Sequence, residues 1–140
     1  MTLGYPLHPL VSAFLCEDEM KAALKDLIGK IMVSIENKDS EEIIFTANDG
    51  RRFKLYHDSR GCEIVTVEDI IGNLSDLVGS PFLMAEEETS TENPEGITKG
   101  NPDSFTWTFY KFATVKGYVT IRWYGTSNGY YSESVNFCKC

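Results

Sequence analysis

One short segment of the sequence gathers side chains that can ligate a metal or act as acid, base or nucleophile. Four of them fall between residues 57 and 63: His57, Asp58, Cys62 and Glu63. Zinc prefers imidazole and thiolate ligands, and Cys138 and Cys140 would complete such a site if the C-terminus folded back. No two cysteines have the Cys-x-x-Cys spacing, and the alternative is a turn between strands that holds a buried thiol. We therefore assign neither a metal nor a cofactor.

Nucleophilic catalysis by the same segment is not favoured. A reactive cysteine needs a lowered thiol pKa and an oriented base. Asp58 and Glu63 lie close to Cys62 in the sequence and would raise the pKa of its thiol instead, while the chain has only two histidines, His8 and His57. The sequence also lacks a glycine-rich phosphate loop and the His-Glu-x-x-His pattern. We therefore expect a protein that is not an enzyme.

A second candidate site lies near the C-terminus, where one arginine is surrounded by aromatic and hydroxyl side chains. Strand alternation places Arg122 and Tyr124 on one face and Trp123 on the other. Such a surface suits stacking on a flat ligand such as a nucleotide base, or a protein hot spot. The alternative is a hairpin whose aromatic rings pack across the strands, with Arg122 in a surface ion pair. The candidate ligand or partner surface comprises Arg122, Trp123, Tyr124, Asn128, Tyr130 and Tyr131.

The acidic residues concentrate in one stretch. The chain has 21 Asp and Glu against 13 Lys and Arg, a formal net charge of −8, and residues 86–104 contain six of the acids and one base. This balance argues against binding to nucleic acid or to anionic membranes. We predict a mobile acidic loop at 86–104 that meets a basic partner, the alternative being a solvated loop without a partner. The candidate partner-binding residues are Glu86, Glu87, Glu88, Glu92 and Glu95.

The remaining elements predict one α+β domain over residues 1–140, which is a common domain length. Residues 1–16 read as an N-terminal arm, and apolar residues at helical spacing predict a helix over 17–28. Alternating apolar residues predict strands at 31–36, 42–47, 51–57, 62–67, 82–85, 105–113, 118–124 and 130–137. Residues 68–78 read as a short helix or turn. We expect a largely antiparallel sheet of about six to eight strands with one or two helices packed on it.

A short pattern occurs twice, fifty residues apart. Asp26-Leu27-Ile28-Gly29 and Asp76-Leu77-Val78-Gly79 each precede an apolar strand. The pattern is consistent with a duplicated unit of one helix end and a meander of strands. The alternative is two unrelated helix ends, each closed by a glycine.

Several longer motifs carry a family resemblance that covers roughly residues 50–137. They include His57-Asp58, Cys62-Glu63, Asp76-Leu77-Val78-Gly79-Ser80-Pro81, Trp107-Thr108-Phe109-Tyr110, Arg122-Trp123-Tyr124-Gly125 and Ser127-Asn128-Gly129-Tyr130-Tyr131-Ser132. With these motifs the chain resembles an uncharacterised domain family of phages, prophages and bacteria. The resemblance implies a phage-type context and supplies no catalytic residues. It favours a non-catalytic accessory protein that neutralises a host factor with a basic surface, as anti-CRISPR and other anti-defence proteins do. The alternative function is binding or sequestering a nucleotide-like molecule.

The expected location is the host cytosol. The apolar N-terminal segment has no basic start and is interrupted by Pro6, His8 and Pro9, unlike a secretory signal. No stretch approaches the roughly 18 apolar residues that span a membrane. We also expect a homodimer in which an exposed last strand pairs with its copy.

Overall fold

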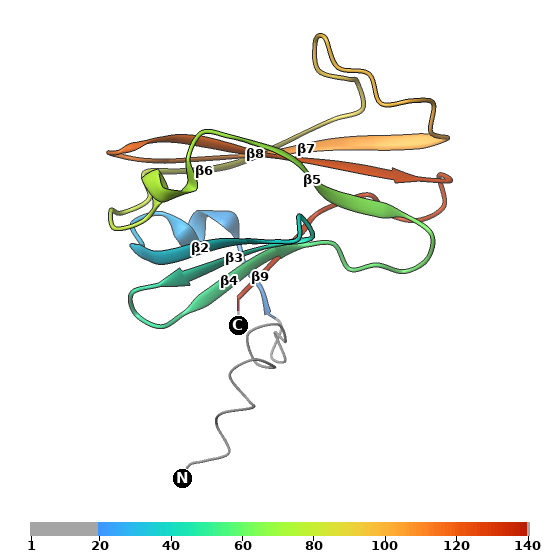
Figure 1. Ribbon diagram of the computed structural model, residues 1–140. Helices are drawn as coiled ribbons and strands as arrows, with labels where there is room; N and C mark the ends of the chain where they lie inside the picture. The colour runs from blue at the N-terminus through green and yellow to red at the C-terminus, as the bar shows by residue number, and fades with distance from the viewer. Residues whose placement is uncertain (1–19, 140) are drawn as a thin grey trace.

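A computed structural model describes residues 20–139, and they form two antiparallel β-sheets that face each other (Figure 1). The order of strands is β1-β9-β4-β3-β2 in one sheet and β5-β8-β7-β6 in the other. Because β1 has only two residues, the first sheet also consists of four main strands. The elements are β1 Met20–Lys21, η1 Leu24–Leu27, β2 Met32–Lys38, β3 Glu42–Ala47, β4 Arg52–Tyr56, β5 Ile64–Ile71, η2 Leu74–Leu77, β6 Met84–Ser90, β7 Ser104–Thr114, β8 Gly117–Ser127 and β9 Asn136–Lys139.

The two sheets have the same internal plan. In each half of the chain, one 3-10 turn precedes three strands that form a meander, β2-β3-β4 after η1 and β6-β7-β8 after η2. The fourth strand of each half then crosses to the opposite sheet: β5 pairs with β8, and β9 pairs with β4. The fold is therefore a repeated unit whose fourth strands are exchanged, which supports the duplication suggested by the repeated Asp-Leu-x-Gly pattern.

The repeated pattern itself lies where the two halves meet. The amide of Gly29 donates to the carbonyl of Phe82 at 2.8 Å, and the amide of Gly79 donates to the carbonyl of Met32 at 2.9 Å. Each partner differs from its counterpart by fifty positions, so the two contacts are equivalent. Gly29 and Gly79 have φ of 84° and 90°, a left-handed conformation that glycine adopts without steric cost.

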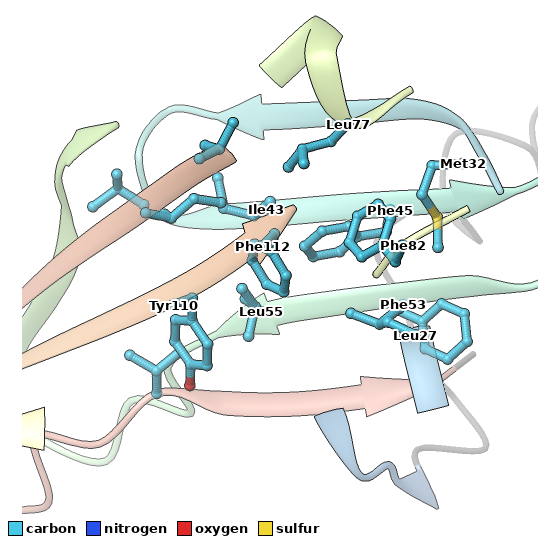
Figure 2. Packing of buried hydrophobic residues seen from close by; sticks show 14 of the residues in the cluster. Leu27, Met32, Ile43, Phe45, Phe53, Leu55, Leu77, Phe82, Tyr110 and Phe112 are labelled. Carbon is cyan, nitrogen blue, oxygen red and sulfur yellow. The ribbon is translucent and has the colours of Figure 1, made fainter. Parts of the chain in front are cut away.

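The core fills the space between the sheets with residues from both halves (Figure 2). The rings of Phe45 and Phe82 lie 5.5 and 5.6 Å from the ring of Phe112, respectively, and all three side chains are fully buried. Leu27 and Leu77, fifty residues apart, are likewise fully buried. Burying each such side chain contributes about 1.5–3 kcal/mol to the stability of the fold, so each leucine anchors its 3-10 turn to the core.

The expected α+β class is replaced by a mostly β fold. No α-helix occurs in the stretch from Met20 to Lys139, whose only helical pieces are η1 and η2. In the segment predicted as a helix at 17–28, the described part forms β1 and η1. Its apolar spacing is misleading, since Leu27 is buried whereas Ile28 is 46% exposed. The predicted N-terminal arm at 1–16 lies outside the described residues.

Three further boundaries differ from the sequence prediction. Residues 68–71, expected to begin a short helix or turn, belong to β5, and only η2 is helical in that segment. Residues 86–90, expected to begin a loop, belong to β6, so the connection to β7 covers residues 91–103. The last strand is β9 at 136–139 rather than 130–137, and it lies between β4 and β1. It therefore does not provide the exposed edge on which the expected homodimer was based. Within the described range, no helix has the length and apolar character needed to cross a bilayer.

Candidate functional site

The loop between β4 and β5 holds a closed His57–Glu63 pair. Nε2 of His57 lies 2.8 Å from Oε2 of Glu63, and Nδ1 lies 2.7 Å from the carbonyl oxygen of Ser134, two residues before β9. The amides of Arg60 and Gly61 donate to the same carboxylate at 2.8 and 2.7 Å. The side chains of the pair are 7% and 0% exposed. A histidine and a glutamate six residues apart thus close the loop on itself.

These contacts stabilise the ionised form of Glu63. The hydrogen bond from His57, aided by the backbone amides, lowers the pKa of Glu63 to about 2 against the effect of burial. Both ring nitrogens of His57 lie within hydrogen-bond distance of an oxygen atom, Nε2 of the Glu63 carboxylate and Nδ1 of the Ser134 carbonyl. Neither nitrogen is free to take a proton from a substrate. Cys62 is exposed beside the pair, whereas Cys138 is buried in β9, and no cluster that would hold a metal is found from residue 20 to 139.

The loop between β8 and β9 repeats this arrangement in the second half. Ser127 donates to Glu133, again six residues later, and Thr106 donates to the other oxygen of Glu133 at 2.7 Å. Burial opposes ionisation of Glu133, but these hydroxyl hydrogen bonds outweigh it and lower the pKa of the carboxyl. The two loops also touch, because a Cβ on Gly61 would lie 2.5 Å from the ring of Tyr131. Glu63 and Glu133 were not predicted as a related pair, although each lies six residues after its hydrogen-bonding partner in the sequence.

A match to the Gly-x-Ser-x-Gly pattern of hydrolases, not recognised in the sequence analysis, also lies at this loop, between Tyr124 and Tyr130 of the candidate surface. Residues 125–129 read Gly-Thr-Ser-Asn-Gly. In a nucleophile elbow the serine occupies a sharp turn from a strand to a helix, and a histidine serves as its base. Here no helix follows Ser127, which ends β8, and its hydroxyl donates to Glu133. Ser127 thus has the contacts of a loop-closing residue.

Arg122 is engaged by acids from the neighbouring strand. A β-bulge between Val67 and Asp69 lets two consecutive acids face the arginine. Nε of Arg122 lies 2.7 Å from Glu68, and Nη2 lies 3.5 Å from Asp69. Burial opposes ionisation of Glu68, but hydrogen bonds from Arg122 and Lys99 outweigh it and lower the pKa of that carboxyl. Arg122 is therefore part of an ion-pair network. From the sequence, such an ion pair was the alternative to ligand binding by this residue.

The network continues into a cluster of aromatic rings on the outer face of the β5–β8 sheet. The guanidinium of Arg122 lies 5.5 Å from the ring of Trp107, whose ring is 4.5 Å from that of Tyr124. Trp107 faces away from the core, yet it is fully buried. Trp123, on the opposite face as predicted, is fully buried in the core. The outer rings must therefore be covered by another part of the chain.

The β6–β7 connection, residues 91–103, provides this cover (Figure 1). The indole nitrogen of Trp107 donates to Oδ1 of Asn93 at 3.0 Å, and the hydroxyl of Tyr124 donates to the carbonyl of Lys99 at 3.4 Å. The ammonium of Lys99 lies 3.2 Å from Glu68. The expected mobile acidic loop is thus fastened to the sheet by hydrogen bonds and an ion pair.

The five acidic candidates all lie at or beside β6. Glu86, Glu87 and Glu88 are exposed on this edge strand, while Glu92 and Glu95 are exposed on the connection that follows. Glu87 accepts a short hydrogen bond from the buried hydroxyl of Tyr110, and burial together with this carboxylate raises the pKa of Tyr110. Glu88 pairs with Lys111 at 2.8 Å. The five acids therefore lie along one edge strand and the connection that follows it, and two of them, Glu87 and Glu88, also bind within the chain.

The remaining candidates lie in the β8–β9 loop and do not join Arg122 in one pocket. Oδ1 of Asn128 accepts from the amide of Tyr130 at 3.0 Å and so shapes the turn. Tyr130 is 82% exposed, and its ring meets that of Tyr131 edge-on at 5.0 Å. Tyr131 is half-buried against Gly61.

The comparisons with known proteins identify a family without a described activity. No curated protein and no solved structure matches the chain. The family model for a domain of unknown function, DUF7448, matches residues 25–137. That range begins within η1 and ends within β9, so it takes in both halves of the sandwich. The chain therefore belongs to the DUF7448 family.

Proposed function

We propose that this protein is a non-catalytic accessory protein that binds a factor with a basic surface and neutralises it, as phage-encoded inhibitors of host defence do. One observation carries the proposal. The β2–β3 connection covers residues 39–41, whereas the equivalent β6–β7 connection covers residues 91–103 and is fastened to the sheet. The added residues place Glu92 and Glu95 in solvent beyond the end of β6, the strand that carries Glu86, Glu87 and Glu88.

The electrostatics favour a basic partner. A net charge of −8 steers a basic protein toward this surface and speeds its association. A fastened loop also loses less conformational freedom on binding than a free one. Catalysis is less favoured, because His57 and Glu63 satisfy each other. A nucleotide-like ligand at Arg122 is less favoured for the same reason, since Glu68 and Asp69 already pair with that guanidinium.

The proposal is tested by charge reversal on immobilised protein exposed to a bacterial lysate. We expect the wild type to retain a basic protein and the Glu92→Lys/Glu95→Lys variant to retain at least tenfold less of it. The matched control is Glu36→Lys/Asp49→Lys, which changes the net charge equally at exposed acids of the other sheet. Circular dichroism verifies that each variant is folded. Equal retention by the loop variant, or equal loss with the control, would contradict the proposed surface.

A further inference from the structure

A cavity of about 280 Å³ lies beside β5, which is at the opposite edge of its sheet from the acidic strand β6. It is formed where β3 begins, β4 ends and β5 begins, and its lining includes Glu41, Glu42, Tyr56, Glu63 and Val65. A second cavity of about 210 Å³ shares Glu41 and Glu42 with it and is also lined by Lys38 and Asp39. The pair of cavities thus has room for an elongated small group.

The floor of the larger cavity carries no unpaired charge. His57 and Glu63 form an ion pair at 2.8 Å, and the remaining carboxylate positions of Glu63 accept from backbone amides. These two residues therefore satisfy each other, and the residues of the cavity walls determine which kind of ligand can bind.

One wall already binds an ammonium group of the protein itself. Nζ of Lys54 lies 4.4 Å from the centre of the Tyr56 ring and 3.5 Å from Oε2 of Glu42. An aromatic face combined with a carboxylate is a general means of binding organic cations. Lys54 is 7% exposed, so this cation is held in a largely desolvated position.

The rim has a further carboxylate. Glu41 is exposed, and no ion pair involves it in the described part of the chain. Asp39, Glu41 and Glu42 together exceed the two positive charges of Lys38 and Lys54 by one, and this excess attracts a cation and repels an anion. Ile64, 63% exposed, and Val65 supply an apolar side along which methylene groups can lie.

From these observations we propose that the paired cavities bind a linear organic cation, an ammonium or guanidinium group on an aliphatic chain, with Glu41 as its charge partner. Two sources share this chemistry: a free small amine and a lysine or arginine side chain of another protein. The site does not depend on the acidic surface of β6 and the 91–103 connection, so either proposal can fail without the other.

Titration of the folded protein with agmatine, followed by amide NMR shifts, tests the site. We expect shifts at residues 41, 42, 56 and 64–66, and none with the neutral chain 1,4-butanediol. Glu41→Gln should weaken agmatine binding about fivefold, the value of a partly exposed ion pair. Glu36→Gln, an exposed acid of β2 outside the cavities, should leave it unchanged.

A capped Gly-Lys-Gly peptide provides the second arm. Binding of agmatine alone identifies a free amine as the source, and stronger binding of the peptide identifies a protein side chain. Binding of neither cation, equal shifts with the diol, or unchanged affinity in Glu41→Gln would overturn the proposal. Because the Glu41 side chain is exposed, the variant should fold, and its amide spectrum verifies this directly.

Discussion

The two halves of this sandwich share a plan but differ in what has been added to it. Residues 24–71 form a compact unit with short connections, whereas residues 74–139 carry the longer β7–β8 hairpin and the 91–103 connection. The contacts at the Asp-Leu-x-Gly turns are nearly identical in both. The difference indicates that the shared parts hold the fold, and that the additions of the second half are the first place to look for function.

The buried glutamates show the same contrast at the level of single residues. Glu63 meets an imidazole and two backbone amides, whereas Glu133 meets hydroxyl groups. Each glutamate closes its loop by binding a side chain six residues earlier in the sequence. The first half uses a charged pair for this task, and the second half uses neutral donors, which should give the two loops different responses to acid.

The largest expected effect tests whether the shared parts are equivalent in energy. Leu27→Ala and Leu77→Ala each remove a fully buried side chain from matched 3-10 turns. We expect each to lower the free energy of unfolding by about 2–5 kcal/mol, as measured by urea denaturation. A loss in one variant without a comparable loss in the other would break the equivalence of the halves.

The next effect separates the two loops by their response to pH. The pKa of Glu63 is lowered from 4.5 to about 2, so its stabilisation is complete above pH 4.5 and is lost as the pH falls toward 2. The urea midpoint of the wild type should fall over this range. The Glu63→Gln variant should be less stable than the wild type at pH 7, and its urea midpoint should decrease much less as the pH falls. The Glu133→Gln variant should still show the part of the decrease that comes from protonation of Glu63. Equal acid profiles for Glu63→Gln and wild type would contradict the charged pair.

A smaller effect compares the two left-handed glycines. The Cβ atom added by Gly29→Ala would have no other atom within 4 Å, so only the φ of 84° disfavours the new side chain. This strain should lower the stability by about 1–2 kcal/mol. Gly79→Ala has the same strain, and its Cβ would also approach Nζ of Lys116 at 3.2 Å. We expect a slightly larger loss of thermal stability at position 79. A neutral result at either position would show that the turn relaxes.

The smallest effect concerns the fastening of the 91–103 connection, which has no counterpart in the first half. Asn93→Ala removes the acceptor of the Trp107 indole at a cost of about 1 kcal/mol. The indole resonance of Trp107 should move upfield and exchange faster with water. The indole of Trp123, which has no hydrogen-bond partner in the core, provides the internal control. No change in the Trp107 resonance would mean that the loop is held by other contacts.

Much of the sheet structure could be predicted from local pattern. The strand at 42–47 was predicted correctly, because the signal for a strand lies in adjacent residues. The helix at 17–28 was wrong where it can be checked, because the apolar residues at helical spacing are divided between β1 and the short turn η1. The division of the strands into two sheets depends on pairings such as β5 with β8, which no local pattern specifies.

The candidate sites show the same limit. Alternation correctly separated Trp123 from Arg122 and Tyr124, because it depends only on neighbouring positions. The partners of Arg122 come from a bulge more than fifty residues away, and the cover of Trp107 comes from a loop. Whether an exposed-looking arginine is free or paired is therefore decided by tertiary structure.

The exchange of fourth strands has a consequence for synthesis on the ribosome. When residues 20–71 have emerged, β4 still lacks β9, and β5 still lacks β8, because both partners are encoded in the second half. The nascent first half therefore presents the open edge of β4 and the unpaired strand β5, and its sheet is complete only after β9 has been made. Folding of this sheet must wait for β9, and a product truncated before β9 would expose the edge of β4 to other chains.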